Sequence, residues 1–154
     1  DLPPDLRIPF LIAGIAIALA WYALARSRSR VARVPAALFA LAFELFCGIG
    51  GLVLLFLWLG TAHMSAWRNE NLLLLNPLCL ALIPASATLL RERPRLTRRA
   101  AILATIVALL AAFALFSKIL PWFAQANLHW ILLFLPIHLA VALALQRRPH
   151  LARQ

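Results

Sequence analysis

Long apolar runs separated by short polar segments make up almost the whole chain. Five of these runs reach or approach the roughly 20 apolar residues that a helix needs to cross a bilayer. They cover approximately residues 8–25, 35–60, 71–90, 100–120 and 128–145. The second run is longer than one crossing, so its helix is expected to tilt. The pattern predicts an all-α integral membrane protein, a bundle of about five transmembrane helices in one domain over residues 1–154.

Composition favours lipid over water as the main solvent. Hydrophobic residues make up 64% of the chain, whereas soluble domains are about 45–50% apolar, and so small a soluble fold could not bury the excess. The formal net charge of +10 would suit a nucleic-acid-binding protein. The arginines, however, gather in short segments between apolar runs, which is typical of cytoplasmic loops. We therefore expect membrane lipids as partners, and no nucleic acid.

The distribution of positive charge predicts the orientation. Basic residues concentrate in segments 26–33, 91–99 and 147–153, which follow the first, third and fifth apolar runs. The alternate segments hold Arg7, Arg68 and Lys118 as their basic residues. Because loops rich in arginine and lysine stay in the cytoplasm, the N-terminus is predicted outside and the C-terminus in the cytoplasm.

Aromatic residues are placed where this orientation puts the membrane surfaces. Four tryptophans fall near predicted outer ends of helices: Trp58, Trp67, Trp122 and Trp130. Trp21 and Tyr22 fall near an inner end. Such rings typically form belts at the two interfaces, and we expect these side chains to lie there.

The densest polar stretch outside the basic segments is 61–71, on the predicted outer side. Together with two nearby positions it supplies the candidate surface residues His63, Trp67, Arg68, Asn69, Glu70, Asn71, Asn76 and His129. Asn127 and Gln125 lie close to His129 in sequence and are expected to join it. One interpretation is a plain connecting loop, with Asn71 or Asn76 as a helix cap and Pro77 in the first turn. The other is a functional surface at the level of the lipid head groups.

The Asn76–Pro77 pair also bears on the length of the third helix. A helix that begins at Pro77 would rise roughly 21 Å before its run ends, which is short for a hydrocarbon core about 30 Å thick. In that case Leu72–Leu75 would lie in the outer leaflet as a kinked or re-entrant piece.

Glu44 and His138 are ionisable groups inside predicted spans. Such groups are costly in lipid, usually face the bundle interior and usually have a partner. Both lie eight or nine residues, roughly 13 Å, from the inner ends of their helices, so their depths match. We expect a contact between them, which either fixes helix packing or serves a proton or substrate.

Several kinds of chemistry find no support in the sequence. It contains no Ser-His-Asp pattern, Gly-rich phosphate loop or HExxH motif, and it predicts neither a metal site nor a cofactor. The spans hold few polar groups, which argues against a small transporter. Cys47 and Cys79 lie inside apolar runs, where they are expected to act as small apolar fillers, the alternative being a disulfide or a reactive thiol.

The polar stretch and its Asn-Pro resemble the membrane part of the bacterial Lnb-type lipoprotein N-acyltransferase family. In that family a histidine of the outer loop is followed by Asn-x-Asn-Leu-Leu and then by Asn-Pro-Leu. The matching positions here are His63, Asn69, Asn71, Leu72, Leu73, Asn76, Pro77 and Leu78. The family's membrane part has five helices and follows an extracytoplasmic domain, a layout similar to the one predicted above.

The resemblance implies a multi-pass protein of the bacterial cytoplasmic (inner) membrane that takes part in lipoprotein processing. It also implies that the chain is the C-terminal part of a longer protein, with an extracytoplasmic domain before residue 1; Asp1 is not an initiator methionine, which agrees. The family's acyl transfer uses a Cys–His pair in the soluble domain. This segment alone is then not catalytic but a membrane anchor and lipid-facing platform, with a lipoprotein substrate and the fused domain as partners. The alternative is a non-catalytic small subunit that packs with other membrane subunits in a larger complex.

Overall fold

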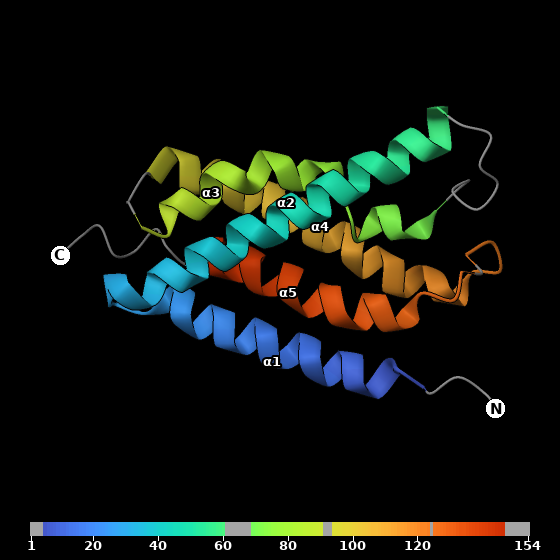
Figure 1. The fold of residues 1–154 in the computed structure, drawn as a ribbon, viewed down its shortest axis with the longest axis horizontal. Helices are drawn as coiled ribbons and strands as arrows, with labels where there is room; N and C mark the ends of the chain where they lie inside the picture. Colours follow the sequence, from blue (N-terminus) through green and yellow to red (C-terminus); the bar gives the residue numbers. More distant parts are fainter. Residues whose placement is uncertain (1–4, 61–68, 91–93, 124, 147–154) are drawn as a thin grey trace.

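The computed structural model describes residues 5–60, 69–90, 94–123 and 125–146, without the side chains of residues 94 and 95. Regular structure in these residues is entirely helical. Within them, five stretches are long and apolar enough to cross a membrane: Arg7–Arg26, Arg30–Gly60, Glu70–Thr88, Leu96–Ile119 and Leu128–Gln146. The predicted all-α fold with five spans is confirmed (Figure 1).

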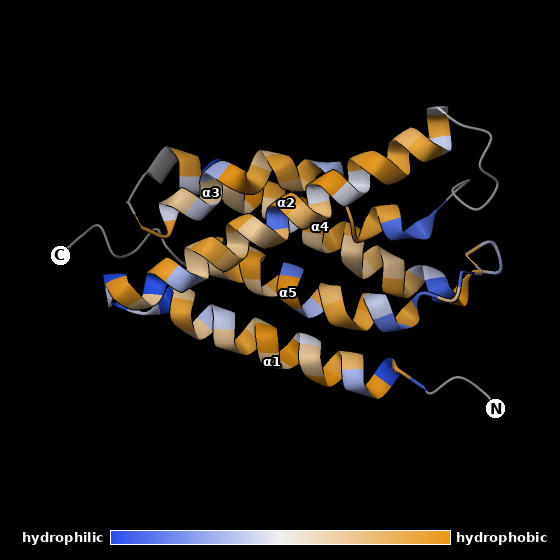
Figure 2. Cartoon of the chain, in the orientation of Figure 1, coloured by the Kyte–Doolittle hydropathy of each residue, from blue (hydrophilic) through white to orange (hydrophobic). Residues whose placement is uncertain are grey.

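Consecutive spans run in opposite directions through one bundle (Figure 1). The first two are α1 (Arg7–Arg26) and the long α2 (Arg30–Gly60), and the last is α5 (Leu128–Gln146). The third span has three pieces, η2 (Glu70–Leu73), η3 (Pro77–Leu82) and α3 (Ile83–Thr88), and the fourth joins α4 (Pro94–Phe116) to η4 (Ser117–Ile119). We call the end at which α1 and α5 begin the amino end of the bundle, and the opposite end the carboxyl end. Polar residues colour both ends, while the middle is mostly apolar (Figure 2).

Small residues allow α1 to lie against α5. Gly14 and Ala18 recur at a spacing that places them on one buried face of α1. A Cβ atom at Gly14 would lie 2.6 Å from the carbonyl oxygen of Leu132, so only glycine permits this approach of the two backbones. Trp21 lies on the same face, and its Nε1 donates to the carbonyl of Ala36 at 2.8 Å. The prediction that Trp21 lies in an interfacial belt is therefore wrong.

Two helices begin earlier than the apolar runs indicate. α2 begins at Arg30 rather than near residue 35, and α4 begins at Pro94 rather than near residue 100. Hydropathy marks the residues that are immersed in lipid, whereas helical hydrogen bonding continues past that boundary. Arginine is a good helix former, so the basic segments extend both helices at the carboxyl end.

The orientation of the bundle in the membrane stays a prediction, and cysteine labelling of intact cells tests it. Ser29 lies in the connection between α1 and α2, at the carboxyl end, and Trp122 lies in the connection between η4 and α5, at the amino end; both are exposed. Trp122→Cys is expected to react with an impermeant maleimide added outside, while Ser29→Cys should react only after the cells are permeabilised, because arginine-rich segments stay inside. The native Cys47 and Cys79 are buried and serve as a silent background. Labelling of Ser29→Cys in intact cells would show that the predicted orientation is wrong.

Candidate functional site

The third span is broken just before Pro77. Proline has no N–H and restricts the residue before it to extended conformations, and Asn76 has φ −104° and ψ 128°. The Asn76 side chain accepts a hydrogen bond from the N–H of Leu78 at 3.0 Å and so caps the next piece. The expectation that Asn76 acts as a cap is confirmed, and Leu72–Leu75 lie in a piece separate from the helix that follows. Their position in the outer leaflet stays a prediction.

The break leaves a backbone carbonyl that another helix must satisfy. In a continuous helix the N–H of Leu78 would bond the carbonyl of Leu74, but it is taken by Asn76. The Nε2 atom of His138 lies 3.0 Å from that carbonyl oxygen. A carbonyl can only accept, so Nε2 carries the hydrogen and donates it. Because unpaired backbone groups are costly in hydrocarbon, this bond from α5 makes the break tolerable.

The expected contact between Glu44 and His138 is wrong. His138 donates to the third span, and within the described residues Oε2 of Glu44 has no hydrogen-bond partner, although Glu44 is only 2% exposed. The reason is the direction in which the Glu44 side chain leaves α2, since successive side chains of a helix point about 100° apart. Phe43 faces α5, with its ring centroid 5.0 Å from that of His138, while Glu44 faces Cys79 of the third span.

Small residues of α2 form the surface on which the broken span packs. A Cβ atom at Gly51 would lie 2.3 Å from the carbonyl oxygen of Leu75, and one at Gly48 would lie 2.9 Å from the nitrogen of Leu80. Cys47 and Cys79 lie buried in the same contact as free thiols. Close approach of α2 therefore holds the non-helical turn in place from one side, as His138 does from α5.

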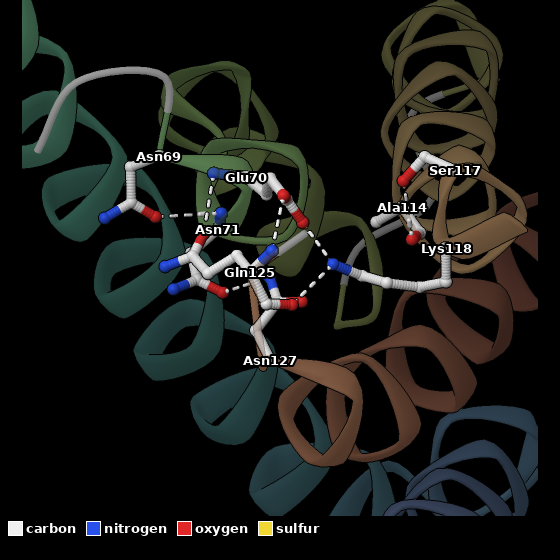
Figure 3. Close-up of polar contacts among 8 residues, drawn as sticks. All are labelled: Asn69, Glu70, Asn71, Ala114, Ser117, Lys118, Gln125 and Asn127. Atoms are coloured by element: carbon white, nitrogen blue, oxygen red, sulfur yellow. Dashed lines mark hydrogen bonds and ion pairs between the residues drawn. The ribbon is translucent and has the colours of Figure 1, made fainter. Parts of the chain in front are cut away.

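A polar cluster joins three spans at the amino end (Figure 3). We call Glu70, Asn71, Lys118, Gln125 and Asn127 the amino-end cluster. The carboxylate of Glu70 accepts from Lys118 Nζ and, at 2.9 Å, from the N–H of Gln125. Gln125 returns the contact, since its Oε1 accepts from the N–H of Glu70 at 2.9 Å and its carbonyl accepts from Lys118 Nζ at 2.9 Å. These bonds fix η2 to the connection between η4 and α5.

Asparagine side chains add two further hydrogen bonds at this cluster. The Nδ2 of Asn127 donates to Oδ1 of Asn71 at 2.8 Å, while Asn127 Oδ1 is buried and has no partner among the residues that the structure describes. The side chain of Asn69 accepts from the N–H of Asn71 at 3.0 Å and caps η2. Asn71 is thus held at its backbone N–H by Asn69 and at its side-chain Oδ1 by Asn127. These two bonds fix the direction of its side chain.

The structure brings together part of the predicted surface. Glu70 and Asn71 meet Gln125 and Asn127, as their sequence positions suggested. The ring of His129 instead packs on Phe10 of α1 and on Trp130, at 5.4 and 5.3 Å between centroids. His63, Trp67 and Arg68 lie outside the described residues.

Lys118 was missed among the candidate residues. The signal was present in the charges: Lys118 is the only lysine of the chain and, with Glu70, one of few charged residues in the two basic-poor connections. A cation and an anion that share one end of an apolar bundle are natural partners, because each is costly to leave unpaired there.

Within the described residues, the side chains at this end are suited to hydrogen bonding with a polar ligand. The amino-end cluster offers amides and an ion pair, and its neighbour Ser117 donates its hydroxyl to the carbonyl of Ala114. Across the described parts of the chain, no three His, Cys, Asp or Glu side chains are grouped to hold a metal ion. The residues in place can orient a polar ligand, and they include no activated nucleophile within the described ranges.

Comparison with known proteins identifies the chain at the level of its domain. Searches of curated proteins and of solved structures found no match. A family model for the Lnb transmembrane domain matches residues 4–150. That range covers all five spans and the Asn-Pro break. The chain therefore belongs to the family of Lnb transmembrane domains.

Proposed function

We propose that this domain is the membrane platform of a lipoprotein N-acyltransferase-like enzyme, on which lipid-linked groups are held for acyl transfer. The observation that carries the proposal is the amino-end cluster, where Glu70, Lys118 and Gln125 lock together the broken third span and the start of α5. A plain connecting loop needs no such set of bonds between distant segments. A surface that presents Asn71 in one direction at the edge of the apolar region requires these bonds.

The proposal assigns catalysis to an extracytoplasmic domain that precedes this one. The family membership and the recognition chemistry of the cluster support this division. A soluble active site would approach the membrane at the amino end, where α1 begins. The arginine-rich carboxyl end would then lie in the bacterial cytoplasm, with the protein in the inner membrane and its N-terminal side outward, as the concentration of arginines at that end suggests.

Replacing the domain tests whether it acts as a lipid-binding platform or only as a membrane anchor. In cells whose lipoprotein N-acylation depends on the full-length protein, residues 5–146 would be replaced by an unrelated five-helix anchor of the same orientation. We expect most N-acylated lipoprotein to disappear, because the exchanged helices lack the surface that presents the lipid. The measurement is mass spectrometry of lipoprotein N-terminal peptides.

Two controls accompany that exchange. The amount and the outward display of the soluble domain must equal those of the wild type, which surface labelling measures. A chain carrying Ser29→Ala, a change at the exposed carboxyl end, should acylate normally. Full acylation by the protein with the replaced domain would show that this domain acts only as an anchor, and would contradict the platform proposal.

A further inference from the structure

A small groove lies beside Asn71, on the side of the bundle away from Lys118. Its volume is about 140 Å³, and it lies between α2, the broken third span and α5. It is lined by Phe46, Asn71, Leu74, Leu75, Trp130 and Phe134. Asn71 is the polar residue of this lining, so the groove pairs one amide with apolar walls.

The break in the third span and a set of aromatic rings shape this groove. Leu74 and Leu75 form its wall just before the Asn-Pro turn, where the chain leaves the helical path. Phe134 stacks on Phe46 with 6.1 Å between centroids and lies 6.1 Å from Trp130. These rings connect α2 to α5 and give the groove a rigid aromatic side.

The groove opens toward lipid. Phe46 is 60% exposed and Trp130 is 41% exposed, and both lie on spans whose exposed faces are apolar. Trp130 is in the first turn of α5, while Phe134 is one turn, about 6 Å, deeper. The opening therefore runs from Asn71, at the amino end, toward the apolar middle of the bundle.

Size and polarity together define the ligand. A dry apolar cavity of about 150 Å³ can hold one benzene, so this groove has room for roughly six carbons. Asn71 Oδ1 is occupied by Asn127, and within the described residues no acceptor contacts Asn71 Nδ2. The amide thus offers a donor at the polar end of an apolar slot, which complements an ester carbonyl followed by a hydrocarbon chain.

We propose that this groove binds the ester-proximal part of one acyl chain of a bilayer phospholipid, with the ester carbonyl accepting a hydrogen bond from Asn71 Nδ2. Phospholipids are the molecules that surround an exposed span, and Asn71 belongs to η2 at the polar amino end of the bundle, where we expect their ester groups. The site goes beyond the platform proposed above, because binding of a resident phospholipid requires no acyl transfer.

Position-specific photolabelling of the purified chain in lipid nanodiscs tests the site. Trace phosphatidylcholine would carry a diazirine either within the first roughly six acyl carbons or near the methyl end. We expect the ester-proximal probe to label peptides covering 69–76 and 128–135 well above the labelling by the chain-end probe. Equal labelling by both probes, or labelling spread evenly over the exposed faces of α1 and α4, would show ordinary bilayer contact and overturn the proposal.

Two matched variants test the role of Asn71. Asn71→Asp keeps an oxygen for Asn127 but removes the donor, so labelling of the two peptides should fall about tenfold, as expected when one buried hydrogen bond is lost. Asn76→Asp makes the same chemical change outside the groove lining and keeps its cap, so it should label like the wild type. An equal loss in both variants would reject the hydrogen bond from Asn71.

A second probe fixes the source of the acyl chain. A diacylglyceryl lipopeptide with the same ester-proximal diazirine should label the two peptides less than the phospholipid does. Labelling by the lipopeptide alone would overturn the assignment to phospholipid. These measurements need no enzymatic activity, so their failure leaves the platform proposal standing, and the reverse also holds.

Discussion

Gly51→Ala is expected to destabilise the domain by about 3 kcal/mol, the upper range for overpacking a tightly packed site. A Cβ atom there would lie 2.3 Å from the carbonyl oxygen of Leu75 and 2.7 Å from Cδ of Pro77. Both neighbours belong to the backbone or ring of the broken turn, so neither can rotate away. The measurement is thermal or denaturant-induced unfolding of the purified protein in detergent.

The adjacent glycine provides the control. A Cβ atom at Gly50 would lie 3.3 Å from Cδ1 of Leu75, the far end of a flexible side chain. Gly50→Ala should therefore leave stability nearly unchanged, and it carries the same gain in helix propensity as Gly51→Ala. Similar unfolding midpoints for the two variants would contradict the close packing of α2 on the third span.

Lys118→Met is expected to cost about 3–5 kcal/mol, the range for breaking a buried ion pair by removing one partner. The side chains of Glu70 and Lys118 are 8% and 18% exposed. Without Lys118 the carboxylate keeps, among the described residues, the N–H of Gln125 as its one donor, and the carbonyl of Gln125 loses a bond as well. Unfolding in detergent again supplies the measurement.

A double variant separates the lost charge partner from lost packing. Adding Glu70→Gln to Lys118→Met removes the unpaired negative charge while keeping an oxygen that can accept from Gln125. The double variant should be more stable than Lys118→Met alone, because the two changes act on one contact. If the double variant is instead as unstable as the sum of the single changes, the ion pair does not hold this end together.

Hydrophobic runs predicted the spans well because lipid imposes a length on every apolar helix. The same rule marked the break: Pro77 cannot continue a helix, and Asn76 before it supplied the cap. The starts of α2 and α4, at Arg30 and Pro94, were predicted too late in the sequence. Hydropathy measures immersion in lipid and not helical hydrogen bonding.

The contacts between helices were harder to predict. Matched depth suggested a pair between Glu44 and His138, but depth says nothing about rotation around the helix axis. The donor on His138 instead satisfies a carbonyl of Leu74 that only the break leaves free. The partnership of Lys118 with Glu70 joins segments 48 residues apart, and a single sequence gives no direct measure of such proximity.

The bond from His138 to the Leu74 carbonyl also has a meaning for biosynthesis. The third span is made well before α5, yet its break is satisfied by a side chain of that last helix. α1 likewise finds its most extensive contact in α5. A nascent chain that has inserted four spans still holds an unpaired backbone carbonyl in lipid and a first helix without its main neighbour. Arrival of the fifth span closes both, so the first and fifth spans of this domain complete the bundle together.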